Sequence, residues 1–86
     1  MEGENKKHID YPAELTFKSI FWYRPSLKQI IISTIAEHEL QAEVSERASR
    51  NGKFISITIT AQFPSEDSLN NLCDHISILE GYYMMF

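Results

Sequence analysis

One stretch of the chain alternates between apolar and polar residues, and it limits the folds that the sequence can adopt. It runs from Lys53 to Phe63. Its apolar members are Ile55, Ile57, Ile59 and Ala61, and its polar members are Ser56, Thr58, Thr60 and Gln62. A period of two places the first set on one face of a sheet and the second set on the other. The stretch therefore predicts a central strand with helices over its isoleucine face and an open hydroxyl face.

Three further segments have weaker strand signals. From Ala13 to about Phe21, apolar residues alternate with polar ones, whereas residues 41–49 alternate less clearly and carry many charges. Residues 82–86 read as a last apolar strand. Asn51-Gly52 lies between 41–49 and the central strand. This dipeptide predicts a two-residue type I′ hairpin turn, because that turn needs positive φ at both central residues.

Two segments show helical spacing instead. The first follows Pro25, and its apolar stripe consists of Leu27, Ile30, Ile31, Thr34, Ile35 and His38. The second begins at Ser65 and ends near residues 75–77, with a stripe of Leu69, Leu72, Cys73 and Ile76. Ser26 and Ser65 are candidate N-caps, since serine favours that position. Both segments are predicted to be amphipathic helices that cover the sheet.

The resulting element order, β-α-β-β-α-β, predicts an α+β fold of the ferredoxin-like sandwich type. Two right-handed crossovers with a hairpin between them give an antiparallel four-stranded sheet of order 4-1-3-2, with both helices on one face. A chain of 86 residues can build one such two-layer core. We therefore expect a flexible N-terminal tail over residues 1–11 and a single domain over 12–86.

Composition disfavours several classes of partner. No apolar run approaches the roughly 18 residues of a membrane span, and the first eight residues are polar, without a hydrophobic signal core. The single cysteine agrees with a reducing compartment, so we expect a cytoplasmic protein with no membrane association. A formal charge of −4 disfavours non-specific nucleic-acid binding.

Specific RNA binding on the open sheet face would need aromatic side chains on the two central strands, where bases can stack. The residues expected there are Thr16, Lys18, Ser56, Thr58 and Thr60. None of these is aromatic, so a nucleic-acid partner is not expected.

Catalytic and metal-binding patterns are also missing from the sequence. Cys73 and His75 are two residues apart on a predicted helix and point to opposite sides, so they cannot form a dyad. His8, His38 and His75 lack metal-ligand spacing, and no second cysteine supports them. Cys73 is expected to be an inert buried thiol. We expect no enzyme activity, no metal and no cofactor.

Two resemblances add to this interpretation. Residues 11–18 (YPAELTFK), residues 51–58 (NGKFISIT) and the closing apolar strand resemble the YbeD-like family of small bacterial proteins of unknown function. That resemblance implies a ferredoxin-like fold related to ACT regulatory domains and supplies no catalytic residues. Residues 23–27 (YRPSL) are similar to the Asp-Arg-Pro-Gly-Leu loop with which many ACT domains bind amino acids. Tyr23 and Ser26 depart from that loop, which argues against amino-acid binding of the usual ACT kind.

The predicted topology brings distant loops to one end of the molecule, called the rim here. The expected members are Trp22, Tyr23, Arg24, Ser26, Arg50, Lys53 and Tyr82. The start of the first helix offers free N–H groups and a positive dipole end. With the nearby cations, it makes Arg24, Ser26, Arg50 and Lys53 a candidate binding site for a small anionic metabolite. The structural alternative is a set of solvated surface charges.

Two functions of different classes are consistent with this rim. The first is a non-enzymatic regulatory or ligand-sensing module that binds a small anionic metabolite. The alternative is a protein–protein interaction adaptor that uses Trp22, Tyr23 and Tyr82, or the edge of the last strand. Residues 82–86 carry no side-chain charge that would discourage edge pairing, so a homodimer through Tyr82–Phe86 is the predicted assembly in that case.

Overall fold

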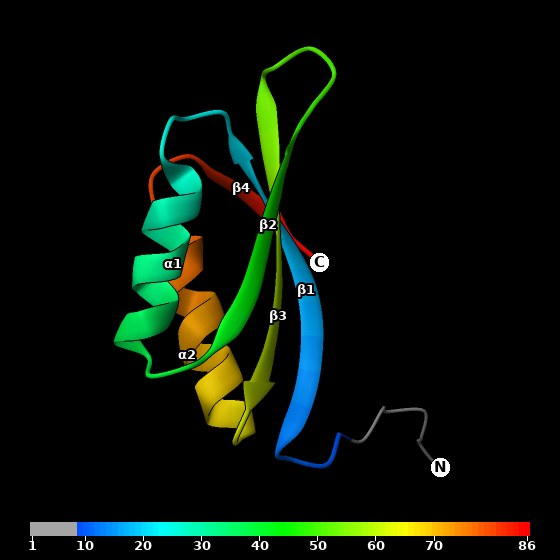
Figure 1. Ribbon diagram of the computed structural model, residues 1–86, viewed down its shortest axis with the longest axis vertical. Coiled ribbons are helices and arrows are strands. Elements are labelled where there is room, and N and C mark those ends of the chain that lie inside the picture. Colours follow the sequence, from blue (N-terminus) through cyan, green and yellow to red (C-terminus); the bar gives the residue numbers. More distant parts are fainter. Residues whose placement is uncertain (1–8) are drawn as a thin grey trace.

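The computed structural model describes residues 9–86, which form one sheet with two helices on one of its faces (Figure 1). The elements in chain order are β1 (Ala13–Trp22), α1 (Leu27–Glu37), β2 (Ala42–Ala48), β3 (Phe54–Phe63), α2 (Glu66–Ser77) and β4 (Tyr82–Met85). The strand order is β2-β3-β1-β4 with every neighbouring pair antiparallel. Read from the other edge this is 4-1-3-2, so the predicted ferredoxin-like fold is confirmed.

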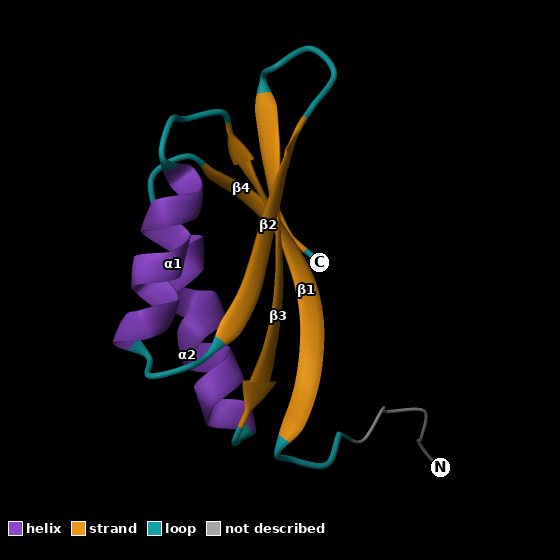
Figure 2. Cartoon of the chain, in the orientation of Figure 1, coloured by secondary structure: helices purple, strands orange, loops and turns teal. Residues whose placement is uncertain are grey.

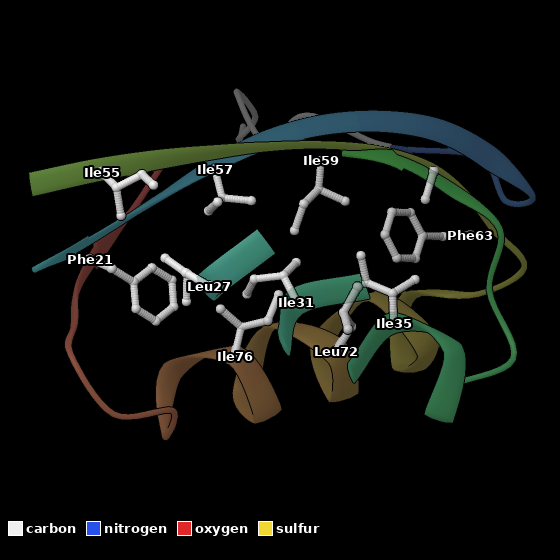
Figure 3. Packing of buried hydrophobic residues seen from close by; sticks show 11 residues of the cluster. Phe21, Leu27, Ile31, Ile35, Ile55, Ile57, Ile59, Phe63, Leu72 and Ile76 are labelled. Carbon is white, nitrogen blue, oxygen red and sulfur yellow. The ribbon is translucent and has the colours of Figure 1, made fainter. Parts of the chain in front are cut away.

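The core lies between the sheet and the helices, as the alternation in β3 predicts. Ile55, Ile57, Ile59 and Ala61 are all buried. Figure 3 shows Ile55, Ile57 and Ile59 pointing from β3 toward the helices. The partners from elsewhere in the core cluster are Phe21, Leu27, Ile31, Ile35, Phe63, Leu72 and Ile76. Burying one such isoleucine stabilises the fold by about 1.5–3 kcal/mol, so this cluster holds the two layers together.

β1 is longer than expected, and this changes the end of the sheet. It pairs with β3 along its whole length, from Ala13 opposite Phe63 to Trp22 opposite Phe54. The sequence analysis ended this strand at about Phe21, whereas Trp22 is its last residue. Proline at position 25 stops the extended pairing only after Tyr23, whose N–H still donates to the Lys53 carbonyl at 2.8 Å.

The hairpin between β2 and β3 does not have the predicted turn type. Of the two residues Asn51 and Gly52, only Gly52 has positive φ, at 75°, so Asn51 does not adopt the type I′ conformation. The Asn51 side chain instead accepts hydrogen bonds from the Ser49 hydroxyl at 2.8 Å and from the Lys53 N–H at 3.0 Å. These bonds stabilise a longer loop, which projects beyond the rest of the sheet in Figure 2. The register is unaffected, because Ser49 still donates to the Phe54 carbonyl.

The two predicted helix caps differ. The Ser65 hydroxyl accepts a hydrogen bond from the Ser68 N–H at 3.1 Å, so this cap is confirmed. Ser26 occupies the N-cap position of α1, as predicted, but its side chain makes no cap hydrogen bond. A capping serine needs extended backbone, whereas Ser26 is left-handed with φ 64°.

The two ends of the described chain complete the picture. β4 is extended by Phe86, whose N–H and C=O both bond to Lys18. Most of the expected tail, residues 1–8, lies outside the described residues; Ile9 is exposed, and Tyr11 packs partly against the core. No helix within residues 9–86 has the length and apolar character needed to cross a membrane.

Candidate binding site on the open sheet face

The expected rim exists as one end of the molecule. Tyr23 is bonded to Lys53 of the hairpin, and the Trp22 N–H donates to the Gly81 carbonyl at 2.8 Å. The end of β1 therefore touches both the β2–β3 hairpin and the start of β4. The rim residues do not, however, converge on a single site.

Arg24 is committed to the loop before β4. Its Nη1 donates to the Glu80 carbonyl at 2.7 Å, and its Nη2 lies 3.9 Å from the Glu80 carboxylate. The arginine stem also lies beside Gly81, where an added Cβ would sit 3.7 Å from the Arg24 Cδ. This side chain therefore links the end of β1 to the loop after α2.

The other predicted anion ligands, Ser26, Arg50 and Lys53, are exposed residues at the same end of the molecule. Ser26 is exposed, and its carbonyl accepts the Ile30 N–H at 3.1 Å as the first bond of α1. Arg50 and Lys53 are exposed members of the hairpin loop. No hydrogen bond or ion pair within residues 9–86 joins Arg24 to either of them.

The predicted interaction aromatics divide between surface and core. Trp22 and Tyr23 are 50% and 53% exposed. Tyr82 is half-buried against the core, where its ring meets Phe21 edge-on at a centroid distance of 5.8 Å. Tyr82 therefore has a packing role, and the exposed aromatic surface is formed by other residues.

A hollow on the open face, here called the arginine hollow, lies beside the hairpin and has a volume of about 390 Å³. Its lining includes Ile20, Arg47, Ser49, Arg50, Phe54 and Ser56. Neither guanidinium group has a hydrogen-bond or ion-pair partner among the described residues. Sequence reasoning named Arg50 but missed Arg47, which it counted only among the many charges of residues 41–49. Its phase in β2, opposite Ser56, was the signal that places it on the open face.

Three rings form an aromatic cluster next to this hollow: Trp22, Phe54 and Tyr83. Trp22 stacks on Phe54 with centroids 4.4 Å apart and planes 28° from parallel. Tyr83 lies 6.1 Å from Trp22 and 5.4 Å from Phe54. The expectation that the central strands carry no aromatic residue on the open face was wrong, because β1 extends through Trp22 and Phe54 lies on the same face of β3 as Ser56.

The open face of the sheet carries different types of side chain at its two ends. Nearest the hairpin, Trp22 pairs with Phe54, and one step further Ile20 pairs with both Ser56 and Met84. At the opposite end Glu43 pairs with Thr60 and Glu14 pairs with Gln62. The face is therefore aromatic and basic beside the hairpin and acidic and hydroxylated at the far end.

The histidines and the cysteine lie in the helical layer, away from this face. His38 and His75 share a hydrogen bond between Nε2 and Nδ1 at 3.0 Å, which joins the C-terminal ends of α1 and α2. Burial, together with the nearby Asp74 carboxylate, raises the pKa of the half-buried Cys73 thiol. No group of three or more metal-ligating side chains occurs in the part of the chain that the structure describes.

The chain matches a protein-family model over almost its whole length. The family model described as "Protein of unknown function (DUF493)" covers residues 6–86. The comparison with curated proteins found no match.

Solved structures of similar shape include relatives of two kinds. One solution structure of protein HP0495 from H. pylori has a TM-score of 0.80 and 18% identity, covering 95% of this chain and 89% of that one. The ACT domain of a GTP pyrophosphokinase from Chlorobium tepidum has a TM-score of 0.71 and 11% identity, covering 85% and 94%. The C-terminal domain of the MgtC protein from Mycobacterium tuberculosis has a TM-score of 0.60 and 10% identity, covering 92% and 89%. At these identities the likeness shows a shared ACT-like fold.

Proposed function

This chain belongs to the DUF493 family of proteins of unknown function, and from that premise we propose that it is a non-enzymatic, ACT-like regulatory module that binds an anionic ligand in the arginine hollow. The proposal keeps the ligand class expected from the sequence but moves the site from the start of α1 to the open face of the sheet. Arg50 is retained from the predicted set, and Arg47 takes the place of Arg24.

One observation carries this proposal: two arginines without partners line the same hollow. A guanidinium group presents five donors and stays charged at every physiological pH. Surface arginines without partners are common when they stand alone. Here Arg47 and Arg50 instead share a concave surface with the ring of Phe54, and such a surface suits a carboxylate or phosphate that both can reach.

The rest of the lining supports binding over chemistry. Its hydroxyls already have roles, since Ser49 donates to Asn51 and Ser56 donates to the Arg47 carbonyl at 3.3 Å. The lining side chains are cationic, hydroxyl or apolar, so they would hold and orient an anion without supplying a carboxylate or imidazole for proton transfer. A cationic hollow without catalytic groups fits a sensing module.

The ACT-like fold is a second support, but a weaker one. A regulatory role is attached to that fold by analogy, because the same sandwich carries many unrelated functions. The site itself must therefore be tested directly.

Isothermal titration with inorganic phosphate and with citrate tests the proposal. We expect saturable binding of at least one of these anions to the wild-type protein, and its loss in an Arg47→Gln/Arg50→Gln double variant. Arg24→Gln together with Lys28→Gln is a charge-matched control, since it removes two positive charges outside the lining of the hollow. If both double variants lose anion binding equally, the effect comes from net charge and the hollow is not a specific site. If the wild-type protein binds none of the anions, the proposal is wrong.

A second candidate function, the interaction adaptor, is favoured by the free edge of β4. Tyr83, Met84 and Phe86 are 55%, 43% and 64% exposed, and no charged side chain guards this edge. The partner proposed here is a second copy of the chain, paired along Tyr82–Phe86. Analytical ultracentrifugation at high micromolar concentration should show a dimer that Met84→Lys disrupts, whereas a monomer at all concentrations would contradict it.

A further inference from the structure

We propose that the anion bound in the arginine hollow is the phosphate of a nucleotide unit, and that the aromatic cluster binds its base. This inference rests on the proposed function, because it uses the same two arginines. It adds a ligand class, a planar base joined to a phosphate, and gives a role to three aromatic residues that anion binding alone leaves unused.

Phe54 links the two parts of this surface. It lines the arginine hollow and also stacks on Trp22. A ligand held by Arg47 and Arg50 therefore lies directly beside the aromatic cluster. A small inorganic anion would make no use of that arrangement, whereas a nucleotide carries its charged and its planar parts side by side.

The rings of the aromatic cluster are exposed to solvent and contact one another. Trp22 is 50% exposed although it stacks on Phe54, and Tyr83 is 55% exposed. Three rings that contact one another hold each other's orientation, so little side-chain freedom remains to be lost on binding. Exposed rings in a fixed orientation provide a platform on which bases stack.

The position of the platform on the sheet is also informative. Trp22 ends β1 and Phe54 begins β3, and the two residues are direct partners on the two central strands. One class of RNA-binding domain with a four-stranded sheet binds single-stranded RNA by stacking bases on aromatic residues of that sheet. The requirement stated in the sequence analysis is thus met by residues that it did not consider.

Local charge agrees with this ligand despite the formal net charge of −4. Arg47 and Arg50 line the hollow together with Phe54, Lys53 precedes Phe54 in the hairpin loop, and Lys18 follows on β1 one step beyond Ile20. The acidic members of the face, Glu14 and Glu43, pair with residues at its far end. A single-stranded nucleic acid would therefore cross the sheet at the hairpin end, away from the acidic residues.

The proposed nucleotide unit has two sources, a free nucleotide and a single-stranded nucleic acid. Fluorescence of Trp22, the only tryptophan, reports stacking directly. We would titrate the protein with inorganic phosphate, with a nucleoside monophosphate and with an unstructured oligonucleotide of about ten nucleotides, a length within the range of known single-strand sites. Quenching by the monophosphate or the oligonucleotide at concentrations at least tenfold below those needed for phosphate is the expected result. Which of the two binds more tightly identifies the source.

Variants then separate the two halves of the surface, with fluorescence anisotropy of a labelled ligand as the readout. Trp22→Leu and Tyr83→Leu should each weaken binding roughly 5- to 150-fold, the range reported for removing one stacking ring. Ile32→Ala is the matched control, because it changes an exposed apolar residue on α1 and should leave affinity unchanged. Thermal melting confirms that each variant is folded.

Salt dependence tests the arginines. Two phosphate contacts on a single strand should weaken binding about sevenfold between roughly 50 and 200 mM salt, from a slope of about −0.7 per contact. The Arg47→Gln/Arg50→Gln variant should bind weakly and lose most of this salt dependence.

The outcomes distinguish this inference from the proposed function. Binding of phosphate with no gain for nucleotides overturns the inference and leaves the anion site standing. Nucleotide binding that is insensitive to Trp22→Leu and Tyr83→Leu overturns it as well. If none of the anions binds, both the inference and the proposed function are overturned. Dimerisation through the aromatic cluster, with no nucleotide binding, would assign this surface to a second copy of the chain and also overturn the inference.

Discussion

Replacing Ser19 with alanine should make this protein more stable. Ser19 lies on β1 with its side chain on the core face, between Ile57 of β3 and Met85 of β4. The residue is 0% exposed, and its hydroxyl has no hydrogen-bond partner among the described residues. A buried hydroxyl that loses its water hydrogen bonds without replacing them is a net cost to the folded state.

The size of the effect follows from two opposing contributions. An unsatisfied buried hydroxyl destabilises the folded state by about 1–3 kcal/mol. Removing one oxygen atom leaves a void of roughly 10–15 Å³, which at about 24 cal/mol per Å³ costs only about 0.3 kcal/mol. Strand propensity hardly enters, because alanine and serine are both modest strand formers. We therefore expect Ser19→Ala to raise the free energy of unfolding by about 1–2 kcal/mol.

The assay is urea unfolding followed by circular dichroism, supported by thermal melts. A gain of 1–2 kcal/mol corresponds to an increase in Tm of about 4–16 °C in a domain of this size. Ser56→Ala is the matched control on the neighbouring strand, since its hydroxyl is on the open face and donates to the Arg47 carbonyl at 3.3 Å. That variant should change stability by less than about 0.5 kcal/mol, in the destabilising direction.

A loss of stability of 1 kcal/mol or more in Ser19→Ala would refute this reasoning. It would mean that the hydroxyl is satisfied in the folded protein, by a partner other than the described side chains and backbone. An unchanged urea m-value is required in either case, because a change would place the effect in the unfolded state.

Three other predictions concern residues of the rim and the helical layer. Arg24→Gln should lower the unfolding free energy by about 1 kcal/mol in urea melts, because it removes the bond to the Glu80 carbonyl, and it should leave anion affinity unchanged. Ser26→Val should lower stability by about 1–2 kcal/mol and Ser26→Gly should not, since φ is 64° there and only glycine adopts it without strain. Cys73 should react with a thiol reagent more slowly than an unfolded control at neutral pH, with its rate profile displaced to higher pH. Because the folded pKa is raised, the associated stability is complete below the unfolded thiol pKa and declines as the pH rises through the folded value.

Much of the fold was predictable because its signals are local. The alternation around Ile57 specifies a strand with one buried face, and the helical spacing around Leu72 specifies an amphipathic helix; both assignments need only neighbouring residues. Ser65 was identified as a cap for the same reason, since its hydroxyl reaches an N–H only three residues away. Such features can be read from one segment without knowing what packs against it.

The errors came from competition between local and more distant interactions. Asn51-Gly52 favours a two-residue turn by backbone preference, but the Asn51 side chain is already bonded to Ser49 and Lys53, which selects a longer loop. The predicted strand ended before Trp22, because Pro25 follows closely. Pairing of the whole of β1 with β3 outweighs that signal and carries the strand through Trp22.

The rim was predicted as a place but not as a site. Topology alone brings Tyr23, Lys53 and Gly81 to one end, and the structure does so. Which way Arg24 points is decided by the Glu80 carbonyl, a backbone group far along the chain whose position no local pattern encodes. A topology diagram therefore identifies candidate site residues that lie close together. It does not determine where their side chains point.

The aromatic cluster is the clearest case of a feature that depends on register. Trp22 and Phe54 meet only because β1 and β3 are antiparallel in this register, and a slip of one residue would move one ring to the core face. Tyr83 joins them where the pairing of β1 with β4 shifts between Ile20 and Phe21, an irregularity that lets Tyr82 face the core while its neighbour contacts the open-face rings. A regular β4 would have kept strict alternation through this region. The proposed binding surface thus depends on one long-range register and one local break in it, so a variant that regularises β4 should lose the cluster while retaining the fold.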